Sequence, residues 1–150
     1  MLKSMFLATA AFIAFALGVI PAHAHHYSTH RALVLNEESI VPVNLLLCTK
    51  KEDADSVLIA NEQGGPERAQ AQANFLQSLR ADNGSPRCVI DAGYVTPLVV
   101  YRRVPITIRM GDETVEVEAS LIEVRVRTDD GFSGIYFSPV PLFIVDGIEV

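Results

Sequence analysis

The stretch from Cys48 to Cys88 reads CTKKEDADSVLIANEQGGPERAQAQANFLQSLRADNGSPRC, and it decides the fold because a segment of helical character lies between two cysteines. At its start, Thr49–Glu52 matches a capping box, in which the threonine hydroxyl and the glutamate carboxylate each accept a backbone N–H. Apolar residues then recur at helical spacing, which predicts a helix over about 50–63, ended by two glycines, and a second over 66–80 that begins with a proline. Because the connection is so short, we expect the two helices to form an antiparallel hairpin.

The sequence on either side of this stretch has β character. Ile40–Cys48 is a short apolar run with β-branched residues, which predicts the first core strand. Thr114–Arg127 alternates between apolar and charged residues, and the parity changes at Ser120–Leu121, which predicts a bulge or a bend there. Further strands are expected at Arg31–Leu35, Cys88–Ile90, Tyr94–Val104, Ile106–Met110, Gly134–Phe137 and Val140–Val145, with Pro105 as a bend.

These patterns predict an α+β fold. We expect one antiparallel sheet of about five to seven strands, with the helical hairpin inserted after the first core strand and packed on one face. A partly closed barrel with the same hairpin is the alternative, because a bent strand favours closure of a sheet. The sequence shows no internal repeat or linker, so residues 40–150 are expected to form a single domain, preceded by a flexible segment over 25–39.

The first 24 residues have the three-part layout of a secretory signal peptide. Lys3 gives a positive start, the uncharged run Met5–Ile20 follows, and Pro21 ends that run. Ala22–Ala24 supplies the small residues that signal peptidase requires, so cleavage is expected after position 24. An uncut membrane anchor is the alternative, but the run has 16 residues, fewer than the ~20 that span a bilayer as a helix. We therefore expect a periplasmic or extracellular protein.

The net charge excludes some classes of partner. The chain carries 12 Lys and Arg against 18 Asp and Glu. Cleavage after position 24 removes only Lys3 from these, which leaves 11 against 18 and a net charge of −7. An acidic chain without a basic stripe binds nucleic acid and anionic lipid poorly, because neutralisation of phosphates dominates such binding. We expect an unknown protein or small-molecule partner, no nucleic acid, and no membrane contact after cleavage.

The two cysteines, Cys48 and Cys88, are predicted to form a disulfide, because an even number of cysteines in an exported protein is typical of such a bond. The bond would pin the base of the helical hairpin and contribute about 4 kcal/mol in the chain-entropy description. Two separate buried thiols are the alternative. A redox role is not favoured, because the cysteines do not form a Cys-x-x-Cys motif.

The histidines that survive the expected cleavage are His25, His26 and His30, all within the first six residues of the mature chain. Together with the free α-amino group they are candidate ligands for copper, nickel or zinc, because these ions favour nitrogen donors. The alternative is a solvated tail in which the histidines bind nothing.

Two further groups of side chains are candidates for function. Tyr101, Arg102 and Arg103 form a compact basic patch for an anion or a partner, because arginine binds carboxylates and phosphates in a fork. Cross-strand pairing with glutamates is the alternative account of this patch. The second group consists of three glutamates in the predicted strand Thr114–Arg127, which are candidates for the carboxylates of a hydrolase. Because apolar and charged residues alternate in this strand, a solvated sheet face is the favoured explanation of these glutamates. These carboxylates are Glu116, Glu118 and Glu123.

No catalytic residue is predicted. The chain has no Gly-x-Ser-x-Gly elbow, no glycine-rich phosphate loop and no His-Glu-x-x-His motif. We therefore expect a small exported, non-catalytic binding or accessory protein. A metal-binding protein that uses its N-terminal histidines is the first alternative, and a carboxylate-based hydrolase is the second.

Overall fold

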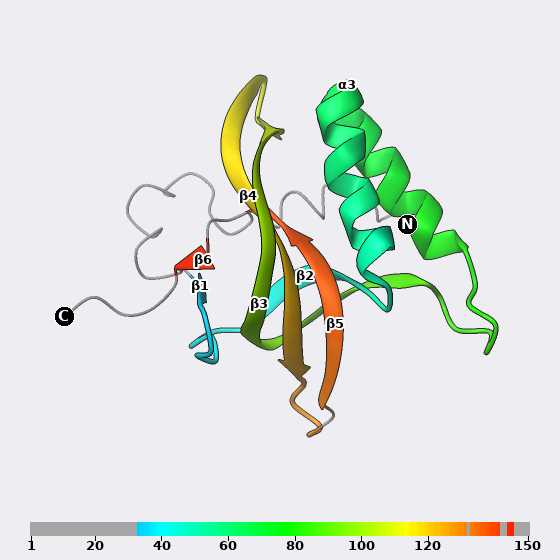
Figure 1. Cartoon of the computed structure of the whole chain (residues 1–150), viewed down its shortest axis with the longest axis vertical. Coiled ribbons are helices and arrows are strands. Elements are labelled where there is room, and N and C mark those ends of the chain that lie inside the picture. Colours follow the sequence, from blue (N-terminus) through cyan, green and yellow to red (C-terminus); the bar gives the residue numbers. More distant parts are fainter. Residues whose placement is uncertain (1–32, 132, 142–143, 146–150) are drawn as a thin grey trace.

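The computed structural model describes residues 33–131, 133–141 and 144–145 and confirms an α+β architecture (Figure 1). Strands β2 to β5 form an antiparallel sheet in the order β2-β3-β4-β5, which closes into a small barrel, while β1 and β6 form a separate parallel pair. The elements are β1 (Leu33–Val34), β2 (Val43–Cys48), α3 (Lys51–Ser78), β3 (Cys88–Met110), β4 (Glu113–Arg127), β5 (Ser133–Val140) and β6 (Ile144–Val145).

The helical region is one element, α3, where the sequence predicts two helices. Within α3, Gly65 departs from helical geometry with φ 80° and ψ −169°, and a proline follows it. Gln72 Nε2 donates a hydrogen bond to Ser56 Oγ at 3.0 Å although the two residues are 16 positions apart, so the parts of α3 before and after Gly65 lie beside each other (Figure 1). The structure therefore has one helical element with a kink at Gly65 in place of the two predicted helices.

The predicted capping box at the start of the helix is wrong. The N-cap is Lys50, and no side chain caps the helix there. The N–H of Thr49 instead donates to the carbonyl of Arg87 at 3.1 Å, which ties the entry of α3 to the segment that leads into β3. A long-range main-chain bond thus replaces the local cap.

The sheet has fewer strands than predicted, because the three strands predicted between residues 88 and 110 form one continuous strand, β3. β3 runs for 23 residues, pairs with β2 over 88–93 and continues along β4 over 94–110. Pro105 was expected to bend the chain, but it pairs with Glu118 within an unbroken run of partners. Proline lacks only the backbone N–H donor. It is therefore tolerated at a strand position whose N–H would point away from β4.

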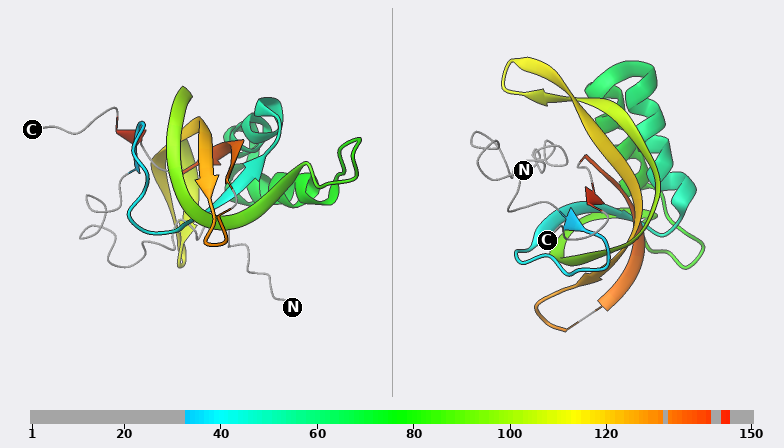
Figure 2. Two further views of the ribbon diagram at one scale, coloured as in Figure 1. Left: turned by 90° about the horizontal axis from the view of Figure 1, so that it is seen from below. Right: turned by 60° about the vertical axis from the view of Figure 1, so that its left-hand side comes forward.

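The predicted bulge near Ser120–Leu121 of β4 lies instead on β3. β4 contributes consecutive residues to its pairing with β3, and the register shifts fall between Pro97 and Val99 and between Val100 and Arg102. The extra residues are thus on β3, which bends around β4 where the sheet curves into the barrel (Figure 2).

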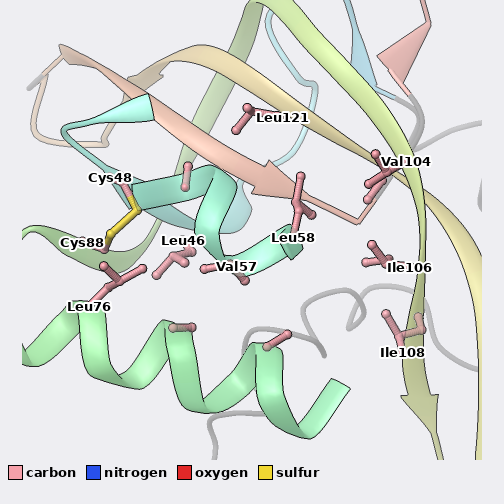
Figure 3. Close-up of a cluster of buried hydrophobic side chains, with 14 residues drawn as sticks. Leu46, Cys48, Val57, Leu58, Leu76, Cys88, Val104, Ile106, Ile108 and Leu121 are labelled. Atoms are coloured by element: carbon pink, nitrogen blue, oxygen red, sulfur yellow. A yellow bond between two sulfur atoms is a disulfide. The ribbon is translucent and has the colours of Figure 1, made fainter. Parts of the chain in front are cut away.

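Two apolar clusters lie on the two faces of the sheet and explain the parity change in β4. Odd-numbered residues up to Leu121 pack against α3, and even-numbered residues from Ile122 onward line the barrel interior. Figure 3 shows the first cluster, with Val57 and Leu58 of α3 directed toward the sheet. The parity therefore changes where β4 passes from the cover of α3 to the wall of the barrel.

The Cys48–Cys88 disulfide is confirmed, with both cysteines at 1% exposure or less. The two cysteines face each other directly in the β2–β3 register, and Cys48 also pairs with Phe137 of β5. The bond therefore lies at the seam where the barrel closes. No helix in the described ranges is long and apolar enough to cross a membrane.

Part of the segment expected to be flexible packs against β3. Asn36 N–H donates to the carbonyl of Pro97 at 2.7 Å, and Ser39 N–H donates to the carbonyl of Val95 at 2.8 Å. Residues 36–39 thus cover the edge of β3 just beyond the end of β2.

Candidate functional site

The sheet face that carries α3 is only partly covered, and its open part exposes apolar side chains. Val99 is 39% exposed, Tyr101 40% and Ile135 55%. The register places them on one face, because Val99 pairs with Glu123 and Ile135 pairs with Arg125, and the two β4 residues are two positions apart. We call Val99, Tyr101, Glu123, Arg125 and Ile135 the outer face; the lower ends of β4 and β5 extend past α3 in Figure 1.

Tyr101 is the best-anchored side chain of the outer face. Its hydroxyl donates to Glu123 Oε1 at 2.7 Å, Lys51 Nζ lies 4.5 Å from its ring centroid, and its ring centroid is 6.1 Å from that of Phe137. The hydrogen bond to Glu123, helped by desolvation, raises the pKa of Tyr101 above its ordinary value. An exposed tyrosine held rigid in this way loses little entropy on binding, as is typical of residues that anchor protein interfaces.

Positive charge gathers around the outer face although the chain carries a net charge of −6. Lys51 lies over the ring of Tyr101, Arg125 belongs to the outer face, and the exposed Lys50 precedes Lys51 in the chain. Glu123 is the acidic residue of the outer face, and it already accepts the hydroxyl of Tyr101. The outer face is therefore locally basic within an acidic protein.

The structure does not bring Tyr101, Arg102 and Arg103 together as one patch. Arg102 lies under α3, where its Nε is 2.8 Å from Asp55 Oδ1 and its Nη2 is 3.7 Å from Glu62 Oε1. Arg103 belongs to the opposite face, where its Nη2 donates to the carbonyl of Ile144 at 2.9 Å. The role of this trio in binding an anion or a partner stays a prediction, and only Tyr101 lies on the outer face.

The most buried ion pair of the described residues joins Asp53 and Arg87 beside the disulfide. Arg87 Nη2 donates to Asp53 Oδ1 at 2.7 Å, and Arg87 Nε donates to Asp53 Oδ2 at 3.0 Å. This forked contact raises the pKa of Arg87 through the hydrogen bond and the opposite charge. The pair ties the first turn of α3 to the residue that precedes β3, so its role is to stabilise the fold.

The three carboxylates considered for a hydrolase do not gather on one face, because Glu123 lies apart from the other two. Glu116 and Glu118 are exposed on the part of β4 that extends beyond the barrel, and they face away from the side that carries Glu123. Two other carboxyl groups have pKa values below the ordinary range, Glu38 through its hydrogen bond with Arg127 and Glu67 through Arg109. A lowered pKa favours the ionised form, as expected for carboxylates in ion pairs, whereas a general acid requires a raised pKa.

The predicted metal ligands His25, His26 and His30 lie outside the described residues. Among residues 33–131, 133–141 and 144–145, no group of three or more histidine, cysteine or carboxylate side chains is placed to hold a metal ion. The metal site of the sequence analysis therefore stays a prediction.

Comparison with known proteins gives no relative. No protein-family model, no curated protein and no solved structure matches this chain.

The sequence analysis missed Val99, Lys51 and Ile135 as members of a surface. A signal was present in β4, because the charged residues move to odd positions after Leu121 and so mark where α3 stops covering the sheet. Only the register with β3 and β5 shows which apolar residues share that uncovered face.

Proposed function

We propose that this chain is an exported, non-catalytic protein that binds a partner protein through the outer face. The observation that carries the proposal is the exposure of Val99 and Tyr101 on β3 and of Ile135 on β5, the two strands that flank β4, on one side of the sheet. Exposed apolar residues that gather on a surface and are bordered by charges are typical of interaction sites. A tyrosine among them, held by Glu123 and Lys51, adds a residue type that dominates binding energy at such sites.

Export is supported by the buried disulfide, since such bonds persist in oxidising compartments. We propose that residues 1–24 act as a cleaved signal peptide and that α3, taken as a helical hairpin pinned by Cys48–Cys88, is the rigid support of the outer face. The support is direct: α3 packs on the same face of the sheet, and its Lys51 lies over the ring of Tyr101.

A site-specific cross-link tests the proposal. A photo-reactive phenylalanine analogue at position 135 is expected to trap one defined partner in the native host, and the same analogue at position 116, which is exposed on the far face, is expected to trap none. The trapped protein is then purified, and its binding to the wild type is compared with its binding to Ile135→Glu.

The expected result is binding that Ile135→Glu abolishes while the disulfide and the circular dichroism spectrum stay unchanged. Equal trapping at positions 135 and 116, or a purified partner that binds Ile135→Glu as well as the wild type, would overturn the proposal.

A further inference from the structure

At two places, the unpaired edges of strands in this sheet are protected from pairing with another strand. On β3, the side-chain amide of Asn61 pairs with the backbone N–H and carbonyl of Thr107, at 2.9 and 2.7 Å. On β4, pairing with β5 begins only at Ser120, and the preceding residues of that edge include three exposed glutamates. Capping groups and charged residues are the means by which proteins prevent an edge from pairing with another strand. The three glutamates are Glu113, Glu116 and Glu118.

The edge of β5 has no such protection over Ser133–Tyr136. β5 pairs with β4 along its whole length, but on its second edge the described residues supply one strand partner, Cys48, opposite Phe137. The segment Ser133–Tyr136 contains neither a charge nor a proline, and its Ile135 is 55% exposed. In Figures 1 and 2 no strand lies beside this end of β5 on the side away from β4. An edge of this kind is a template for an added strand.

The charges around this edge favour one sign of partner. A strand added beside Ser133–Tyr136 would continue the line of β2, which leaves the sheet after Cys48 as the chain turns into α3. The exposed Lys50 and Lys51 follow Cys48 closely, and the exposed Arg125 lies next to Ile135 on the outer face. An acidic strand would therefore meet positive charge at its end and along one side.

We infer that an extended acidic segment of the partner protein adds to β5 as a strand at Ser133–Tyr136. This inference rests on the proposed function and specifies how the outer face is used. Main-chain hydrogen bonds to β5 hold the segment, alternate side chains lie beside Ile135, and acidic side chains pair with the lysines and Arg125. Alternation of contacts follows from the two-residue period of a strand.

Three synthetic peptides of equal length test this mode of binding. The first alternates valine and glutamate, the second alternates valine and lysine, and the third is the first with N-methyl groups on alternate residues along one edge, which removes main-chain donors and keeps the side chains. Each is titrated into isotope-labelled protein, and the backbone amide shifts of Ser133–Tyr136 are followed by NMR. We expect the valine–glutamate peptide to shift these amides and to bind about tenfold or more tightly than the other two, a difference of ~1.4 kcal/mol or more.

Matched variants locate the binding. Lys50→Glu combined with Lys51→Glu is expected to weaken the valine–glutamate peptide about tenfold, and Glu116→Lys, on the protected edge of β4, is expected to leave it unchanged. Equal binding of the acidic and basic peptides, no binding of either, or no effect of N-methylation would overturn the inference.

Two outcomes separate this inference from the proposed function. If N-methylation has no effect but Ile135→Glu still abolishes binding of the cross-linked partner, strand addition is wrong and the outer face stands as a binding site. If the protein forms a dimer that Ile135→Glu dissociates, the occupant of the edge is a second copy, and the acidic segment is wrong.

Discussion

The side-chain amide of Asn61 forms two hydrogen bonds with the backbone of Thr107, although the residues are 46 positions apart. Asn61 Nδ2 donates to the carbonyl of Thr107 at 2.7 Å, and the N–H of Thr107 donates to Asn61 Oδ1 at 2.9 Å. One side chain of α3 thus supplies β3 with the donor and the acceptor that a neighbouring strand would supply. Because Asn61 is only 7% exposed, these bonds are shielded from water and hold α3 on the extended part of β3.

Replacing Asn61 by alanine is expected to destabilise the protein by about 1–3 kcal/mol, because two main-chain groups of Thr107 lose their partners in a poorly hydrated position. Urea unfolding followed by circular dichroism measures the loss, and hydrogen exchange of the Thr107 amide is expected to accelerate. Gln63→Ala, on an exposed position of the same helix, is the control. An equal loss in both variants would show that the contact between Asn61 and Thr107 is not responsible.

Local patterns in the sequence predict local structure here, and long-range contacts decide the rest. The helical spacing around Asn61 places it on the apolar side of α3, but nothing in the sequence indicates Thr107 as its partner. Thr49 and Glu52 match the sequence of a capping box, yet the N–H of Thr49 donates to the carbonyl of Arg87, which lies beyond the other end of α3. The disulfide could be predicted because the chain offers one pairing. The outer face could not, because it depends on the register of three strands.

Replacing both Cys48 and Cys88 by alanine is expected to cost about 4 kcal/mol of unfolding free energy, the loop-closure value for a bond with this separation. That is a large part of the about 5–15 kcal/mol that stabilises a typical domain. The bond also closes the barrel seam at Phe137, so the exposure of the Tyr101 ring beside Phe137 is expected to change. Denaturant melts of the oxidised and the alanine proteins measure the difference. A midpoint that does not fall would contradict the structural role.

Gly65→Ala is expected to destabilise the protein by about 1–3 kcal/mol, because a side chain in this region of backbone space is strained. Gly65 has φ 80° and ψ −169° and joins the two parts of α3. Gln63→Ala is the control, since Gln63 is exposed and helical and lies two positions before Gly65. Thermal unfolding of both variants tests this, and a smaller loss for Gly65→Ala than for Gln63→Ala would contradict it.

The pair of Glu38 and Arg127 is expected to make stability depend on pH in the acid range. The hydrogen bond from Arg127, followed by its charge, lowers the pKa of Glu38 from its ordinary 4.5. A lowered folded-state pKa means that the stabilisation is fully present above 4.5 and is lost as the pH falls through the folded-state value. The stability difference between wild type and Glu38→Gln is therefore expected to shrink on acidification. The matched control is Glu38→Gln introduced together with Arg127→Gln, because the difference is expected to vanish once the partner that lowers the pKa of Glu38 is removed.

The titration of Tyr101 tests the geometry on which the binding proposal depends. Its pKa is raised from the ordinary 10.0, first by the hydrogen bond that its hydroxyl donates to Glu123 and then by desolvation and the negative charge of that carboxylate. The protonated phenol is thus favoured in the folded protein, so the stabilisation is fully present below pH 10.0 and is lost as the pH rises through the folded-state value. Ultraviolet difference titration against Tyr101→Phe isolates this residue from the other tyrosines. Glu123→Gln is expected to lower the pKa toward the ordinary value, because the amide keeps an acceptor but removes the charge. A tyrosine that titrates alike in the wild type and Glu123→Gln would show that Tyr101 is not fixed by Glu123, and the outer face would lose the rigid anchor on which its proposed binding role rests.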